Sequence, residues 1–113
     1  MTRRPRRGDV HWVALGPGRD TDIRKTRPAV VISNDACNRF GTRVVVVPIT
    51  SNVDSLYPGE ALVRVKGKPA RALGDQIRSV GRQRLRGRVA RLTVDELREV
   101  ERAVRITFGL GAP

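Results

Sequence analysis

The sequence predicts a single small domain of mainly β structure with a C-terminal helix, built as a strongly bent, barrel-like sheet of five to six strands. Three observations predict this class. The chain of 113 residues is long enough for one modest core and too short for two. Short runs rich in Val and Ile recur between segments that contain Gly, Pro, Asn and Asp. Only the C-terminal end carries apolar residues at helical spacing.

The predicted strands are short, and turn-like segments separate them. The first run, DVHWVAL, alternates enough to place Val10, Trp12 and Ala14 on one face. Pro48 cannot donate a hydrogen bond to a neighbouring strand, so we expect it at the end or the edge of its own strand. Residues 34–42 have turn composition and residues 51–59 form a long loop. The predicted strands are residues 9–15, 29–33, 43–49, 60–66 and 73–80.

The C-terminal segment has the signals of a helix with defined ends. Thr93 and Glu96, three residues apart, form a capping box that begins the helix. Gly109 provides a natural stop. Between them four apolar residues recur at helical spacing, and we expect them to face the core: Leu97, Val100, Val104 and Phe108.

The charge is strongly positive and unevenly distributed. The formal net charge is +12, from 23 Lys and Arg against 11 Asp and Glu. Four of the acidic residues fall in the C-terminal helix, so residues 1–92 carry a net charge of +13. Such a surface attracts polyanions with a salt-dependent affinity, which favours nucleic acid as the partner and leaves an acidic protein as the alternative. Residues 1–7 are expected to form a flexible basic arm of the single domain 1–113.

The sequence also excludes several classes of function. The lone Cys37 and lone His11 permit neither an intrachain disulfide nor a structural zinc site. No run of about 18 apolar residues could span a membrane. No apolar segment follows the basic N-terminus as it would in a signal peptide, so a cytoplasmic protein is expected. The GPG at 16–18 lacks the Lys and Ser/Thr of a phosphate-binding loop, and the scattered carboxylates do not suit a two-metal site.

An arginine and hydroxyl constellation remains as candidate chemistry. Arg24, Lys25 and Arg27 stand at the entrance of the second predicted strand, and Thr50 and Ser51 stand where the third ends. If these two strands pair, guanidinium and hydroxyl groups meet at one rim. Such groups hold a phosphate and stabilise the charge that builds on a phosphorane. RNA supplies its own nucleophile, the 2′-OH. The alternative is that these residues are solvated cations and ordinary turn residues.

Five motifs occur in this order along the chain: RGD at 7–9, KTRPAVVISND at 25–35, VVVVPIT at 44–50, GDQIRSV at 74–80 and FGL at 108–110. Over about residues 7–110, these motifs resemble those of the MazF/PemK family of toxin endoribonucleases. The resemblance implies an SH3-like barrel of the CcdB/MazF type that forms a homodimer. It also implies cleavage of single-stranded RNA without a metal or other cofactor. A cognate acidic antitoxin with a disordered tail, similar to MazE, is implied as the inhibitor.

The resemblance assigns roles residue by residue. It implies that Arg27 and Thr50 are catalytic, and that Asn34 and Gln76 bind RNA. Arg24, Lys25 and Ser51 are further candidates for binding the substrate. The loops that flank the groove in the family correspond to residues 16–24 and 51–59. The acidic residue that often precedes K-x-R-P is here separated from it, since Ile23 and Arg24 follow Asp22. The RNA sequence that the protein recognises is therefore not predicted.

Two alternatives from other classes stay open. A gyrase poison of the CcdB type would share the fold, although that activity is associated with a C-terminal Trp-Gly-Ile and this chain ends in FGLGAP. A non-catalytic RNA-binding barrel would need aromatic side chains on which bases stack. Tyr57, in the 51–59 loop, is the candidate for such stacking, and packing within its own loop is the competing interpretation.

Overall fold

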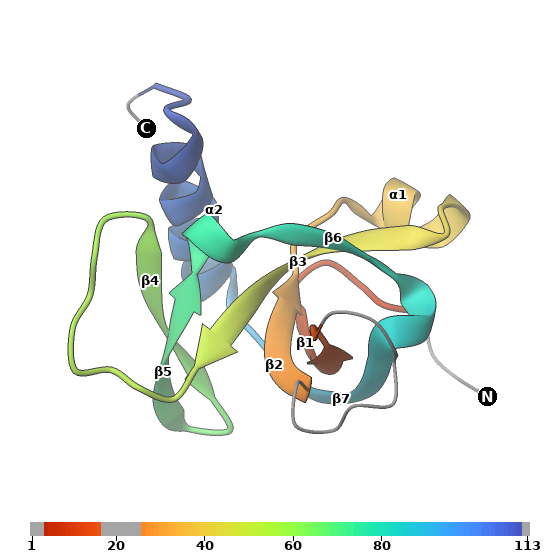
Figure 1. The fold of residues 1–113 in the computed structure, drawn as a ribbon, viewed down its shortest axis with the longest axis horizontal. Coiled ribbons are helices and arrows are strands. Elements are labelled where there is room, and N and C mark those ends of the chain that lie inside the picture. Colours follow the sequence, from red (N-terminus) through yellow and green to blue (C-terminus); the bar gives the residue numbers. More distant parts are fainter. Residues whose placement is uncertain (1–3, 17–25, 112–113) are drawn as a thin grey trace.

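The computed structural model describes residues 4–16 and 26–111, which form a seven-stranded antiparallel sheet and a long C-terminal helix (Figure 1). The strand order is β4-β5-β3-β2-β1-β7, and β6 also pairs with β3. No helix among the described residues is long and apolar enough to cross a membrane. In chain order the elements are β1 (Asp9–Ala14), β2 (Thr26–Val31), α1 (Asp35–Phe40), β3 (Arg43–Thr50), β4 (Glu60–Val65), β5 (Lys68–Leu73), the 3₁₀ turn η2 (Gly74–Gln76), β6 (Arg78–Gly81), the 3₁₀ turn η3 (Arg82–Arg84), β7 (Leu85–Arg91) and α2 (Val94–Phe108).

Strand β3 organises the sheet because it changes partners along its length. Its first four residues pair with β6, residues 46–48 pair with β2 on the other side, and its last two residues pair with β5. Pro48 lies inside β3, opposite Ala29, and so is not at the strand's end. The carbonyl of Val45 accepts a hydrogen bond from Ile32, the residue after β2, so the backbone groups of Val45 face β2. Successive residues of a strand face opposite sides, so the nitrogen of Pro48, three residues later, faces away from β2. On that side the last pair between β3 and β6 is Val46 with Arg78, so the absent N–H of Pro48 removes no hydrogen bond between these two strands.

Two apolar clusters fill the two faces of this sheet. The larger cluster lies between the sheet and α2 and includes Val47, Ile49 and Val100. The smaller one fills the inside of the barrel, where β6 and β7 curl back toward β1 (Figure 1). The interior cluster consists of Val13, Ala29, Val31, Val44, Val46 and Val80. Val10 lies in the larger cluster and Val13 in the interior cluster, so β1 contributes to both. Trp12 does not share the burial of Val10 and Ala14: it is 44% exposed, at the register shift between His11 and Val13 in the pairing of β1 with β7.

The predicted fold class is confirmed, but the predicted strand at 73–80 is wrong. This segment runs along the edge of β3, where η2 interrupts it at Gly74 and divides it between β5 and β6. A Cβ at Gly74 would lie 2.4 Å from the carbonyl oxygen of Gly59, so the close approach of two backbones fixes the turn there. Strands β5 and β7 and helix α1 were not predicted from the sequence.

Helix α2 has the predicted ends, but one expected core residue is exposed. Both hydrogen bonds of the capping box join Thr93 and Glu96, and Gly109 ends the helix in a left-handed conformation with φ of 66°. Val100 is buried and packs against the sheet. Phe108 is 57% exposed, contrary to the prediction, since the last turn of α2 extends beyond the sheet (Figure 1).

The described part of the N-terminal arm contacts the fold. The backbone N–H of Arg7 donates to Asp35 at 2.8 Å, and its guanidinium pairs with Glu101 of α2. Arg6 donates a backbone hydrogen bond to Asp9 at 3.2 Å. These contacts hold residues 6 and 7 between α1 and α2.

Candidate active site

The candidate catalytic pair lies on neighbouring strands. Arg27 is near the start of β2, and Thr50 is the last residue of β3. The two strands pair antiparallel, with Ala29 opposite Pro48. The pairing ends there, and Arg27 and Thr50 each lie two residues beyond this last pair, at the same end of the two strands. The two residues therefore lie at the same end of adjacent strands, where β3 exchanges β2 for β5 as its partner.

Both side chains belong to the face that lines the barrel interior. Side chains two residues apart on a strand share a face. Arg27 follows the alternation of Ala29, and Thr50 follows that of Val46, both of which lie in the interior cluster. Arg27 is exposed and Thr50 is half-buried, so the pair stands at the open rim of the barrel, just outside the apolar interior.

The hydrogen bonding of the pair leaves donors available to a ligand. The Thr50 hydroxyl oxygen accepts a hydrogen bond from the backbone N–H of Asn52 at 3.3 Å, which leaves its proton for another acceptor. None of the carboxylates that the structure describes forms an ion pair with Arg27. A guanidinium and a hydroxyl that both donate at one rim suit an anionic group such as a phosphate.

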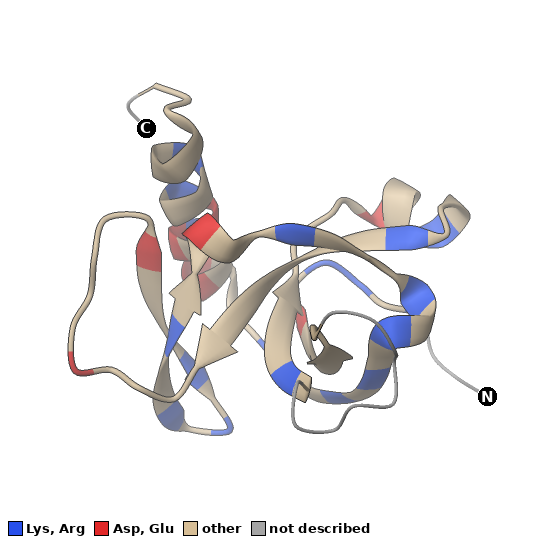
Figure 2. Ribbon diagram, in the orientation of Figure 1, with Lys and Arg blue, Asp and Glu red and all other residues tan. Residues whose placement is uncertain are grey.

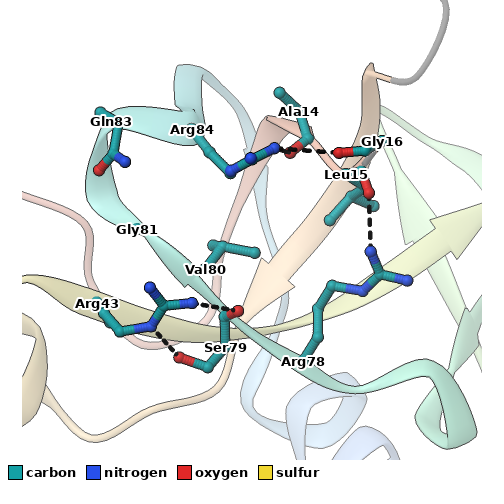
Figure 3. Close-up of a pocket in the computed structure, with 10 residues that line it drawn as sticks. All are labelled: Ala14, Leu15, Gly16, Arg43, Arg78, Ser79, Val80, Gly81, Gln83 and Arg84. Carbon is teal, nitrogen blue, oxygen red and sulfur yellow. Dashed lines mark hydrogen bonds between the residues drawn. The ribbon is translucent and has the colours of Figure 1, made fainter. Parts of the chain in front are cut away.

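A basic pocket opens next to this rim (Figure 3). It has a volume of about 550 Å³ and is lined by Ala14, Leu15, Gly16, Arg43, Arg78, Ser79, Val80, Gly81, Gln83 and Arg84. Arg78 donates to the carbonyl of Leu15 at 2.8 Å, and Arg84 donates to the carbonyls of Ala14 and Gly16 at 3.1 and 3.2 Å. These bonds hold the two guanidiniums across the end of β1. Arg27 and Thr50 do not line the pocket, but Ala14 pairs with Thr26, so the pocket begins one residue from Arg27.

The pocket gives this side of the molecule a positive field. It contains three Arg and no Asp or Glu among its lining residues. Figure 2 shows Lys and Arg along β6, β7 and the turn between them and at the start of β2, whereas several Asp and Glu gather on α2. The arginine-rich run QIRSVGRQRLRGR at 76–88 is the sequence signal for this region, but the alternation of Arg with Gly, Ser and Gln concealed that it lines a pocket.

The structure places Asn34 away from the pair. Asn34 follows the other end of β2, seven residues after Arg27, which corresponds to about 23 Å of extended chain. Its side-chain oxygen accepts a hydrogen bond from Cys37 at 2.8 Å and caps α1. In this chain the Asn34 side chain is the N-cap of α1, and its contact with RNA stays a prediction.

The other predicted binding residues are exposed near the rim or lie outside the described part. Gln76 is exposed in η2, which runs along the same edge of β3 as Arg71, the partner of Thr50. Ser51 and Tyr57 are exposed in the 51–59 loop, which leaves directly from Thr50; Tyr57 is 61% exposed. Arg24, Lys25 and most of the 16–24 loop lie outside the described residues. No group of three His, Cys, Asp or Glu residues in the described ranges is arranged to hold a metal ion.

Comparison with known proteins identifies the family. The chain is 34% identical over 114 residues to "Endoribonuclease MazF9" of Mycobacterium tuberculosis, a match that covers 93% of this chain and 97% of that protein. A crystal structure of MazF from Deinococcus radiodurans matches with 27% identity and a TM-score of 0.79, covering 96% of this chain and 99% of that one. A MazE–MazF crystal structure from the same organism matches with 28% identity and a TM-score of 0.75, with the same coverage of both chains. The family model described as PemK-like, MazF-like toxin of type II toxin–antitoxin systems matches residues 6–108, and the chain belongs to this family.

Proposed function

We propose that this protein is a sequence-specific endoribonuclease toxin that cleaves single-stranded RNA without a metal ion. The observation that carries the proposal is the pairing of β2 with β3, at whose common end Arg27 and Thr50 lie beside an arginine-lined pocket. Family membership supports it, as does the name of the 34% identical relative, an endoribonuclease.

In the proposed reaction the RNA 2′-oxygen attacks the adjacent phosphorus. The 2′-OH loses its proton, an O2′–P bond forms, the P–O5′ bond breaks and the leaving 5′-oxygen gains a proton. The products are a 2′,3′-cyclic phosphate and a 5′-OH. Arg27 donates two parallel hydrogen bonds to the non-bridging oxygens, which carry most charge in the phosphorane. Thr50 donates a third hydrogen bond to the same oxygens or to the leaving oxygen. A guanidinium is a poor base at neutral pH, so Arg27 acts chiefly through its charge.

The proposed partners follow from the charge and the family. A single-stranded RNA occupies the basic side, with Ser51, Tyr57, Gln76 and, outside the described residues, Arg24 and Lys25 as contacts. A cognate antitoxin with an acidic, disordered tail inhibits the enzyme by occupying the same surface. The solved MazE–MazF complex of a relative supports an antitoxin partner. The active form is a homodimer, and it acts in the cytoplasm, where messenger RNA is translated.

Incubation with a long single-stranded RNA in EDTA tests the proposal. Discrete cuts that leave 2′,3′-cyclic phosphate ends support it. A mobility shift without cutting supports the non-catalytic RNA-binding barrel. If the protein neither cuts nor shifts the RNA, the gyrase poison is the alternative that remains. A 2′-deoxy or 2′-methoxy group at the cleaved nucleotide removes the nucleophile and should abolish the cut. Full cleavage of that modified RNA contradicts the mechanism.

A further inference from the structure

The 51–59 loop is anchored by a side chain from a different strand, Arg71 of β5. Arg71 is the β5 residue paired with Thr50, so it lies next to Thr50 on the same face of the sheet. Arg27 lies near the start of β2, the strand that pairs with β3 on its other side. Unlike Arg27, Arg71 is largely buried, with 14% of its side chain exposed.

The guanidinium of Arg71 holds the middle of the loop. Its Nη1 donates to the carbonyl oxygen of Ser55 at 2.5 Å and lies 3.2 Å from the Ser55 hydroxyl. Its Nε is buried without a hydrogen-bond partner and lies 3.6 Å from Oε1 of Glu60. Burial removes the Arg71 guanidinium from water, which is unfavourable for a charged group. The carboxylate of Glu60, whose side chain is 10% exposed, offsets part of this cost by its negative charge.

Glu60 extends the same anchor to the end of the loop. Its Oε1 accepts the backbone N–H of Tyr57 at 2.9 Å while it faces Arg71. At the beginning of the loop, the backbone N–H of Asn52 donates to the Thr50 hydroxyl oxygen at 3.3 Å. The loop is therefore tied at its start, middle and end, and Arg71 and Glu60 supply two of the three ties.

We propose that Arg71, together with Glu60, is a positioning residue that fixes the 51–59 loop beside Thr50 and thereby sets which RNA bases are accepted next to the cleaved bond. This inference rests on the proposed function. Loss of the anchor frees Ser55 and Tyr57 and disturbs the hydrogen bond that Thr50 receives from the loop. A misplacement of about 1 Å in such a site can cost on the order of a hundredfold in rate.

Arg71 could instead act as a second cation for the phosphate, and a conservative variant separates the two roles. Arg71→Lys keeps a positive charge beside Thr50, but an ammonium cannot reproduce the planar fork that reaches Ser55 while it faces Glu60. Positioning therefore predicts that Arg71→Lys resembles Arg71→Gln, whereas a role as a simple cation predicts that Arg71→Lys retains activity.

The experiment combines a loop reporter with RNA cleavage. Tyr57 is the only tyrosine in the chain, so 3-fluorotyrosine labelling gives one ¹⁹F resonance that reports on this loop. Arg64→Gln is the matched control: it removes one positive charge from the adjacent strand β4, where Arg64 binds the carbonyl of Gly67 at 3.1 Å. We expect Arg71→Gln and Arg71→Lys to shift or broaden the resonance, to redistribute the cuts on a defined transcript and to lower kcat/KM by about 10- to 100-fold. Arg64→Gln should leave all three unchanged.

Three outcomes overturn the inference. An unchanged ¹⁹F resonance in both Arg71 variants rules out the anchor. A shifted resonance with wild-type cleavage sites and rate rules out a role in the reaction. Wild-type cleavage by Arg71→Lys but not by Arg71→Gln assigns the effect to charge. If the wild-type chain cuts no RNA, the proposed function and this role in it fail together, while the ¹⁹F spectra still decide separately whether Arg71 holds the loop.

Discussion

At the scale of single residues, the chemistry of the site depends on a charged donor next to a neutral one. Arg27 is exposed at the rim and Thr50 is half-buried, so a phosphate placed between them is held from two sides. Both donors extend from strands that pair with each other, so the fold brings them to one end of the sheet before a substrate arrives. Preorganised donors of this kind act most strongly on the charge that develops in the transition state.

Substitution of the pair should therefore lower the rate more than the stability. Removal of one donor to a developing oxyanion costs on the order of 10²–10³ in rate, so Thr50→Ala should fall by about that factor. Arg27→Ala should fall by at least as much, and Arg27→Lys should also be poor because a point charge cannot reproduce the fork. Single-turnover cleavage of a defined RNA measures the rate of each variant. Arg39→Ala, which loses an equal charge from α1, is the control; wild-type rates in Arg27→Ala contradict the assignment.

Asp35 should make the stability of the fold dependent on pH. The backbone N–H of Arg7, then the Asn38 side chain and the charges of Arg6 and Arg91, hold the pKa of this carboxyl below its ordinary value of 3.8, against a smaller effect of burial. A lowered pKa in the folded state means that the unfolded chain binds the proton more readily. The stabilisation is therefore complete above about pH 4 and is lost as the pH falls through the folded pKa.

Urea unfolding of wild type and Asp35→Asn between about pH 2 and 5 tests this effect. Below the ordinary carboxyl pKa, the free energy of unfolding should fall more steeply with decreasing pH in the wild type than in the variant. Parallel curves would show that the contact with Arg7 contributes nothing to the pH dependence.

The positions of single residues were predictable where a strand pattern constrained them. Two β-branched runs were enough to place Arg27 and Thr50 next to strand ends, whereas the pairing of the two strands was only assumed and is shown by the structure. Asn34 was different, because the same motif that resembles an RNA-binding asparagine also begins a short helix, and its side chain caps that helix. The anchoring by Arg71 was not predictable, since it depends on a pairing between β3 and β5 that no local pattern encodes.

At the scale of elements, the two strands that were not predicted, β5 and β7, lack an alternating apolar pattern but pair with well-formed neighbouring strands. β5 contains Lys68, Pro69 and Arg71, and β7 contains three Arg and a Gly, so neither alternates clearly. β5 is stabilised by pairing with both β4 and β3, and β7 by pairing with β1. Tertiary pairing overrides weak intrinsic preference in such cases. Helix α1 was missed because its six residues are too few to show a helical period.

The turn η2 should be sensitive to a single added methyl group. A Cβ at Gly74 would lie 2.4 Å from the carbonyl oxygen of Gly59 and 3.2 Å from the carbonyl carbon of Ala103, and both are backbone atoms. Overpacking of this kind typically costs about 1–3 kcal/mol, so Gly74→Ala should lower the free energy of unfolding by that amount. Gly87→Ala in β7 is the control, because nothing lies within 4 Å of its Cβ position. Equal denaturant midpoints for the two variants would show that the segments around η2 can move apart at no cost.

The 51–59 loop should contribute to base recognition through Tyr57. This side chain is 61% exposed, which leaves its ring available for stacking on a base, an interaction worth about 1–3 kcal/mol. Tyr57→Ala should weaken cleavage or broaden its sequence preference, and circular dichroism should show an unchanged fold. Identical cleavage maps for Tyr57→Ala and wild type would instead assign the tyrosine to the packing of its own loop.

At the scale of the whole molecule, charge is separated between the barrel and the helix. Four acidic residues lie in α2, and the barrel side carries the arginines of the pocket and of β7. The sum of the charges was readable from the sequence, but the pocket was not, because β6, η3 and the end of β1 meet only in the folded chain. This separation gives a polyanion one preferred side on which to bind.

Binding to that side should therefore depend steeply on salt. Neutralisation of about three to five phosphates of a single strand lowers the affinity by roughly 20- to 130-fold between about 50 and 200 mM salt, because each contact releases condensed counterions. A 2′-methoxy RNA, which cannot be cleaved, allows this affinity to be measured by fluorescence anisotropy on the wild-type protein. An acidic peptide that represents an antitoxin tail should compete with this RNA, and its own affinity should fall over the same salt range. A peptide that binds equally well at both salt concentrations while RNA remains bound would place the inhibitor on another surface. Inhibition would then have to act through a change in the shape of the enzyme instead of through occupation of the basic side.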